Sequence, residues 1–197
     1  MAPVVFDPAG NLYGTTYLGG KNYGHGTVFE LSPPSVQGGS WTEIVLHSFR
    51  PSSDGDFPLA GLALGPGRVL FGTASAGGTN QHGTAFALKP PPISGGTWGF
   101  AVLQSFNVTD GDGPMGGLIL GGPSTLYGTA GGGVHDAGVV FQLSYSGGRW
   151  IETVLYNFGG GSTGVGPTGV GLYNDALYGT TAEGGYKNVG VVYRLSR

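Results

Sequence analysis

The sequence predicts an all-β fold, a β-propeller of four-stranded antiparallel blades with about four repeats and one blade incomplete. A motif of an aliphatic residue, an aromatic residue, Gly and Thr occurs at residues 12–15, 70–73, 126–129 and 177–180. Its aromatic residues, at positions 13, 71, 127 and 178, are 58, 56 and 51 positions apart. No segment has helical periodicity of useful length, and Gly/Pro turns separate the apolar runs. A period near 50 residues with strand-like content indicates a repeat architecture.

Each unit divides into four expected strands. The first is a short apolar, glycine-rich run, at residues 4–7, 59–64, 115–120 and 168–172, and small side chains suit a crowded inner strand. The aromatic-Gly-Thr motif forms the second strand. Residues 26–31, 83–88, 138–143 and 190–195 form the third.

A tryptophan opens the fourth and outermost expected strand, at residues 41–49, 98–106 and 150–158. Val follows four residues after the Trp, Leu five and Phe eight residues after it. This alternation with β-branched and aromatic content predicts a strand that is buried on both faces or nearly so.

We expect one repeat domain over residues 1–197, with blades at about 1–49, 57–106, 113–158 and 167–197. The last blade has no Trp strand, so the count is fifteen strands. Three explanations stay open: a three-stranded blade, a fragment of a longer array, or two chains that pair into one larger ring. We favour incompleteness remedied by self-association, because an exposed strand edge is a site of pairing. A β-helix fits less well, because the repeat length drifts.

Composition excludes several classes of function. Gly and Pro make up 56 of 197 residues (43 and 13), which without a period would suggest disorder. The net charge is −3 and the eight basic residues are scattered, so nucleic-acid binding is not expected. No run of 18 apolar residues predicts a membrane span, and residues 1–3 do not resemble a signal peptide. Without cysteine there are no disulfides or thiolate metal sites.

The first repeat carries a family resemblance. Tyr13-Gly14-Thr15-Thr16 is followed by Gly19-Gly20 and by the Gly-Thr-Val-Phe-Glu-Leu run at 26–31. With the Trp strand and the Asp-Gly connector, this resembles the GloVer-type tandem repeat of choice-of-anchor proteins over essentially the whole chain. The resemblance implies a bacterial exported or surface-attached protein, usually with more copies and a C-terminal sorting anchor. It offers no catalytic residues to transfer.

One face of the predicted propeller gathers the reactive side chains. Loops that join second to third strands and loops that join successive blades emerge on the same side of a four-stranded meander. The ligand-binding candidates on these loops are Tyr23, His25, His82, His135, Asp136, Tyr186 and Lys187. Loops carry binding residues more often than the scaffold does, so we expect this loop face to be the binding face.

Acidic connectors are weak metal candidates. Asp54, Asp56, Asp110 and Asp112 lie in Asp-Gly-Asp sequences that resemble part of a calcium loop, but no full calcium-loop pattern follows. Asp-Gly is also a tight-turn sequence, and we favour that interpretation. The recurring histidines are explained by repetition rather than by zinc, and His47 is expected to pack. We expect no metal and no cofactor.

Catalysis has little support. Glu43 and Glu152 occupy equivalent positions in different repeats, so they do not converge on one substrate. The chain has no nucleophile elbow and no phosphate loop. The repeated aromatics at 13, 71, 127 and 178 are expected to pack between blades. We therefore expect a non-catalytic extracellular or cell-surface module for scaffolding or recognition that self-associates. A carbohydrate-binding, lectin-like propeller is the alternative and a polysaccharide-active enzyme the third hypothesis.

Overall fold

A computed structural model describes residues 2–21, 24–50, 52–93 and 95–196, and it places fifteen strands of this part of the chain in four antiparallel sheets. The first sheet consists of β1 (Val5–Phe6), β2 (Leu12–Thr16), β3 (Thr27–Ser32) and β4 (Thr42–Ser48). The second has β5 (Ala63–Leu64), β6 (Leu70–Ala74), β7 (Thr84–Lys89) and β8 (Gly99–Ser105). The third has β9 (Ile119–Gly122), β10 (Thr125–Ala130), β11 (Val139–Ser146) and β12 (Arg149–Asn157). The fourth has β13 (Val165–Tyr173), β14 (Ala176–Glu183) and β15 (Val192–Ser196).

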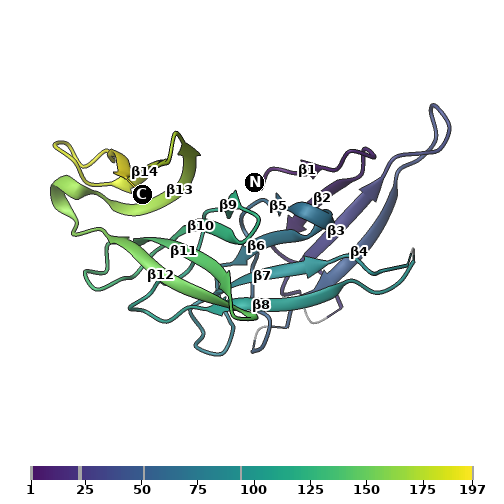
Figure 1. Cartoon of the computed structure of the whole chain (residues 1–197), viewed down its shortest axis with the longest axis horizontal. Coiled ribbons are helices and arrows are strands. Elements are labelled where there is room, and N and C mark those ends of the chain that lie inside the picture. Colours follow the sequence, from purple (N-terminus) through teal and green to yellow (C-terminus); the bar gives the residue numbers. More distant parts are fainter. Residues whose placement is uncertain (1, 22–23, 51, 94, 197) are drawn as a thin grey trace.

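Every sheet is a meander whose strands pair in chain order, as the sequence predicts. Figure 1 shows the sheets following one another around an open arc, with the first and fourth sheets at its two ends. Strands β1, β5 and β9 lie toward the middle of this arc, and the tryptophan strands β4, β8 and β12 lie along its outside (Figure 1). The predicted all-β, blade-like architecture is confirmed, and the described part of the fourth sheet has three strands.

The pairing of the third with the fourth strand shifts register at one repeated place. The shifts lie between Val28 and Phe29, between Ala85 and Phe86, and between Val140 and Phe141. A bulge bends a strand and increases its twist, so the outer strand of each blade is turned in the same way.

Apolar layers between successive sheets form the core. Tyr13, Phe49 and Leu70 belong to the layer between the first and second sheets, and Phe71, Phe106 and Leu126 belong to the next layer. A third layer, between the third and fourth sheets, includes Tyr127, Phe158 and Leu177. Tyr13, Phe71 and Tyr127 are buried between sheets as predicted, whereas the equivalent Tyr178 is 36% exposed.

The tryptophan strands are more exposed than predicted. Most residues of β4 and about half of those of β8 and β12 face solvent, and Trp41 is 49% exposed. The prediction of burial on both faces is wrong because the burial of a strand's faces depends on neighbouring sheets, which do not fully cover the outermost strands.

The inner strands of the first three sheets are shorter than the apolar runs that predict them. The segment just before β5 passes close to the first sheet, because a Cβ on Gly61 would lie 2.7 Å from the Pro3 carbonyl oxygen. The segments just before β5 and β9 and residues 168–170 line a hollow of about 370 Å³. The small residues that the sequence places in these segments leave this space open. Within the described residues, no helix has the length and hydropathy needed to cross a membrane.

Candidate functional site

The predicted loop face is built from contacts between successive sheets. His25 Nδ1 lies 2.9 Å from Asp56 Oδ1, and His82 Nδ1 lies 2.9 Å from Asp112 Oδ1. In both cases the histidine is in a loop between second and third strands, and the aspartate is in the connector to the next sheet. Each pair therefore closes one sheet onto the next, and we call it a clasp.

The junction between the third and fourth sheets has the same backbone hydrogen bond as the other two junctions, but among its described residues it has no His–Asp pair. Phe57 N donates to the His25 carbonyl at 3.2 Å, and Gly113 N donates to the His82 carbonyl at 3.0 Å. The equivalent bond, from Gly166 N to the Ala137 carbonyl, is 2.9 Å long. Ala137 is buried and Val165 packs against the same apolar layer, so two apolar residues take the places of the histidine and the aspartate. The histidines of the first two junctions therefore contribute to joining one sheet to the next.

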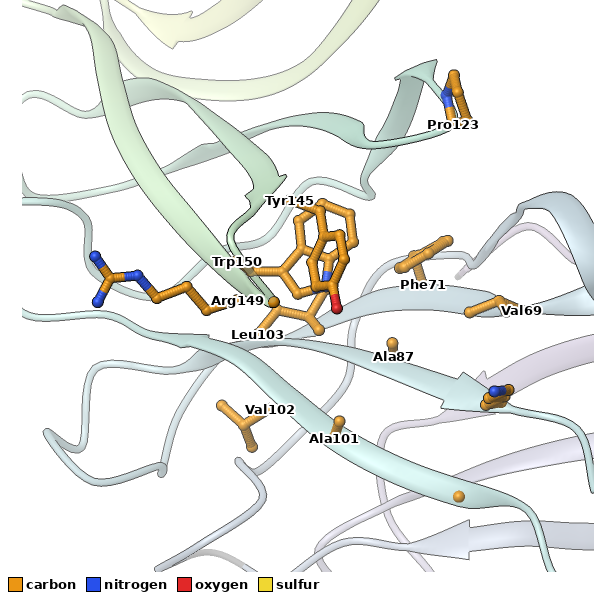
Figure 2. A pocket seen from close by; sticks show the side chains of 13 residues that line it. Val69, Phe71, Ala87, Ala101, Val102, Leu103, Pro123, Tyr145, Arg149 and Trp150 are labelled. Carbon is orange, nitrogen blue, oxygen red and sulfur yellow. The ribbon is translucent and has the colours of Figure 1, made fainter.

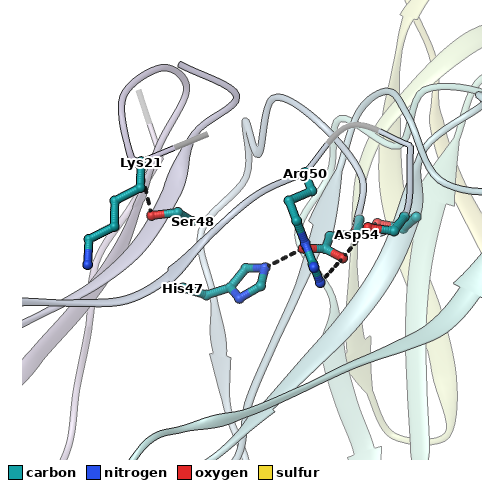
Figure 3. A network of polar contacts seen from close by, with 7 residues as sticks. Lys21, His47, Ser48, Arg50 and Asp54 are labelled. Atoms are coloured by element: carbon teal, nitrogen blue, oxygen red, sulfur yellow. Dashed lines mark hydrogen bonds and ion pairs between the residues drawn. The ribbon is translucent and has the colours of Figure 1, made fainter. Parts of the chain in front are cut away.

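Asp54 is held by a network of polar side chains (Figure 3). His47 Nε2 and Arg50 Nε lie 3.0 and 3.1 Å from Asp54 Oδ2, and the Ser53 hydroxyl donates to Oδ1 at 2.7 Å. Desolvation raises the pKa of the Asp54 carboxyl, but hydrogen bonds from Arg50 and Ser53 outweigh it and lower the pKa. His47 also stacks on Phe100, with ring centroids 3.9 Å apart, so its predicted packing role is confirmed.

The other acidic candidates also have partners within the chain. Asp110 accepts bonds from Gln104 and Asn107, and burial raises the pKa of its carboxyl. Among the described residues no three His, Asp or Glu side chains lie close enough to hold a metal ion. The turn interpretation of Asp54 and Asp110 agrees with these contacts.

The remaining loop-face candidates are exposed. His135 and Asp136 lie in the loop between β10 and β11, and Tyr186 and Lys187 lie in the loop between β14 and β15. Tyr186 is 99% exposed. Tyr23 lies outside the described residues. These side chains come from different sheets, and no hydrogen bond or ion pair joins one to another among the described contacts.

The half-exposed Arg68 forms a polar cluster with the buried Asp7 and Tyr13, which sequence analysis missed. From the second sheet, Arg68 Nε lies 3.2 Å from Asp7 Oδ2 of the first sheet, and Arg68 also bonds to the Tyr13 hydroxyl. Tyr13 in turn donates to Asp7 at 3.0 Å, and burial raises the pKa of Tyr13 to about 12. The sequence gives no signal for this cluster, because Arg68 appears there as one of several isolated basic residues.

A pocket of about 630 Å³ lies between the second and third sheets. Figure 2 shows Trp150 and Tyr145 side by side, with Phe71 across from them. The Trp150 and Tyr145 ring centroids are 5.4 Å apart, and Phe71 and Trp150 meet edge to face at 5.9 Å. Lys89 and Arg149 add two cations to the lining, although Arg149 extends away from the aromatic pair (Figure 2).

Similar pockets lie at the other two junctions. One of about 470 Å³ lies between the first and second sheets and includes Leu46, Arg68 and Trp98. Another of about 420 Å³, which includes Leu155 and Arg194, lies between the third and fourth sheets. Each junction thus has a hollow near its outer strand, and the aromatic pair Tyr145–Trp150 lines the one between the second and third sheets.

Glu152 is a second polar group that the sequence did not single out as buried. Its Oε1 has no solvent exposure and no hydrogen-bond partner among the described residues. Burial, together with the nearby Asp110, raises the pKa of Glu152 to about 7. The acid therefore titrates near neutral pH at the junction between the second and third sheets.

Comparisons with known proteins agree with this repeat architecture. A search among curated proteins found no match. A comparison with protein families matched residues 1–193 to the Gloeobacter/Verrucomicrobia repeat. The match covers all four sheets except the last residues of β15. The chain therefore belongs to the Gloeobacter/Verrucomicrobia repeat family.

Proposed function

We propose that this chain is a non-catalytic repeat module for scaffolding or recognition outside the cell, and that it acts by associating with itself. The observation that carries the proposal is the edge of the fourth sheet. Within the described residues that sheet ends at β15, whereas a tryptophan strand completes each of the other three. An uncovered edge presents backbone N–H and C=O groups that another chain can pair with.

The polar residues support a non-catalytic role. His25, His82 and Asp54 bind partners that hold the sheets together, so they are not available as a convergent acid–base set. Equivalent residues of different repeats lie on different sheets, whereas catalysis of one reaction needs its groups within hydrogen-bond reach of one substrate.

Light scattering tests the self-association. The chain has a mass of 19.9 kDa, and we expect a larger, concentration-dependent mass at micromolar concentration. A constant mass of one chain over that range would contradict the proposal. An antibody against the protein, applied to intact cells and to lysed cells, tests the location. A protein outside the cell is labelled in intact cells, whereas an internal protein is labelled only after lysis.

Carbohydrate binding is a second candidate, favoured by the pocket that Trp150 and Tyr145 line. Aromatic faces stack on apolar sugar faces, and the cations Lys89 and Arg149 suit acidic sugars. On a glycan array we expect binding that Trp150→Ala abolishes and Trp41→Ala, at the equivalent exposed position, leaves intact. Binding lost on Tyr186→Ala instead would assign the sugar to the loop face, and no binding by the wild type would remove the candidate.

A further inference from the structure

The first two junctions within the chain use the same pair of faces, and at the third junction Tyr127 packs on Leu177 and Tyr193 of a sheet without tryptophan. The forward face of a sheet presents the motif aromatic: Tyr13 lies 6.0 Å from Trp98 of the next sheet, and Phe71 lies 5.9 Å from Trp150. The backward face of the following sheet presents its tryptophan and the leucines of its inner strands. Threonine hydroxyls also bond across these two junctions, always from the earlier sheet to the later one. Thr15 donates to the Ala60 carbonyl and Thr73 donates to the Gly116 carbonyl, both at 3.0 Å.

The forward face of the fourth sheet, which we call the tail face, is uncovered. Val192 is 81% exposed, although its equivalents Val28, Ala85 and Val140 are fully buried. Tyr178 and Thr180 on the same face are exposed as well. In the part of the chain that the structure describes, nothing occupies the place that Trp98 and Trp150 take at the first two junctions.

The backward face of the first sheet, which we call the head face, is uncovered too. Trp41 is 49% and Val4 45% exposed, whereas the half-buried Trp98 and the buried Leu62 occupy the equivalent places in the second sheet. Phe6, 57% exposed, is equivalent to Leu64, because Phe6 pairs with Leu12 as Leu64 pairs with Leu70. Leu64 packs into the layer between the first and second sheets.

We propose that the head face of a second copy of this chain docks on the tail face, so that Trp41 of that copy covers Tyr178 and Val192. This inference rests on the proposed self-association and assigns it to the two uncovered faces of the end sheets rather than to pairing between β15 edges. The first two junctions inside the chain already show the aromatic–tryptophan contact, and the two uncovered faces are its two halves. The halves lie at opposite ends of the arc (Figure 1), so a second copy is the occupant that carries the matching face.

The contact is head-to-tail, because the two faces differ. Such a heterologous interface closes into a ring or extends as a chain, and it leaves each single copy with one free face of each kind. Pairing between two β15 edges would differ, because it would use the same strand of both copies and neither Trp41 nor Val192.

Two lysine variants and their mixture test this geometry. Trp41→Lys blocks the head face and Val192→Lys blocks the tail face, because a lysine ammonium is costly to bury without a partner. Both side chains are exposed, so each variant should fold, which its thermal transition checks. Val36→Lys, in the turn between β3 and β4 and 68% exposed, is the matched control.

We expect each blocking variant alone to associate at least ~30-fold more weakly than the wild type in sedimentation velocity, and Val36→Lys to behave as the wild type. An equimolar mixture of the two blocking variants should form a dimer that grows no further, because each copy keeps one usable face. If both variants associate like the wild type, the head-to-tail contact is wrong and self-association by another surface stands. A monomeric wild type would overturn this contact and the proposed self-association together.

Discussion

The position two residues after each tryptophan shows that the neighbouring sheet determines how a side chain is buried and what it contacts. Phe100 lies there in the second sheet and stacks on His47 of the first, with its ring 6° from parallel. Glu152 holds the position in the third sheet and is partly buried beside Asp110. Glu43, in the first sheet, is exposed because no sheet covers the head face within the described structure.

Glu152 predicts a pH dependence of stability. The folded chain raises the pKa of Glu152 from 4.5 to about 7, so the native state binds its proton more tightly than the unfolded state. Stability from this group is complete below pH ~4.5 and is lost as the pH rises through about 7. Glu152→Gln should therefore raise stability at pH 8 by about 1 kcal/mol, after discounting for partial exposure, or about 2–4 °C in Tm.

The control for that experiment is Glu43→Gln, the same change at the exposed equivalent position. It should leave the difference between Tm at pH 5 and at pH 8 unchanged. If Glu152→Gln also leaves that difference unchanged, Glu152 is not the buried acid that the structure describes.

Replacement of different tryptophans by alanine should lower the stability of the fold by different amounts, because the tryptophans differ in burial. Trp98 packs against Tyr13 and lies under the Arg68 guanidinium, whereas Trp41 has no sheet over it. Trp98→Ala should lower the free energy of unfolding by about 2–3 kcal/mol, below the range for a fully buried Trp because Trp98 is half-buried. Trp41→Ala should cost less than ~0.5 kcal/mol in urea titrations at low protein concentration. Equal costs would show that the sheets do not stack as described.

At the scale of the elements, the His25–Asp56 clasp shows which features of the structure can be predicted from the sequence and which cannot. The alternation of turns and apolar runs predicts the strands and their order, because those signals are local. It also places His25 and Asp56 on one side of the molecule. Their pairing depends on how closely a loop meets a connector 31 positions away, which no local pattern encodes. The exposure of β4 is missed for a similar reason, since burial depends on a neighbouring sheet.

The clasp predicts a measurable coupling. We expect a double-mutant cycle of His25→Ala and Asp56→Val, which imitates the Ala137–Val165 pair, to give a coupling of ~0.5–1 kcal/mol. The cycle of His82→Ala and Asp112→Val should give less, because the Asp112 side chain is 47% exposed and that of Asp56 is 10% exposed. Urea unfolding of the wild type, the four single variants and the two double variants measures both. A coupling near zero for the first pair would mean that the backbone bonds alone join the sheets.

At the scale of the whole molecule, stability depends on neighbours. The third sheet packs on both of its faces, with Phe141 in one apolar layer and Tyr127 in the next. The fourth sheet packs on one face and, in its described part, has three strands. In an array where each unit contacts only adjacent units, the less covered end opens first.

Hydrogen exchange checks that order. At a protein concentration low enough to keep single chains apart, amides of β14 and β15 should exchange at least ~10-fold faster than those of β10 and β11. The first sheet, covered on one face but with four strands, should lie between them. Uniform protection from residue 5 to residue 196 would mean that the chain opens as one cooperative unit.

The threonine hydroxyls that donate from one sheet to a backbone carbonyl of the next have a consequence for growth. All such bonds run the same way along the chain, from Thr15 to Ala60 and from Thr73 to Gly116. An assembly that repeats them has polarity, like a filament with two unlike tips. Subunits would then add to those tips at different rates, and a cap that fits one tip would not fit the other.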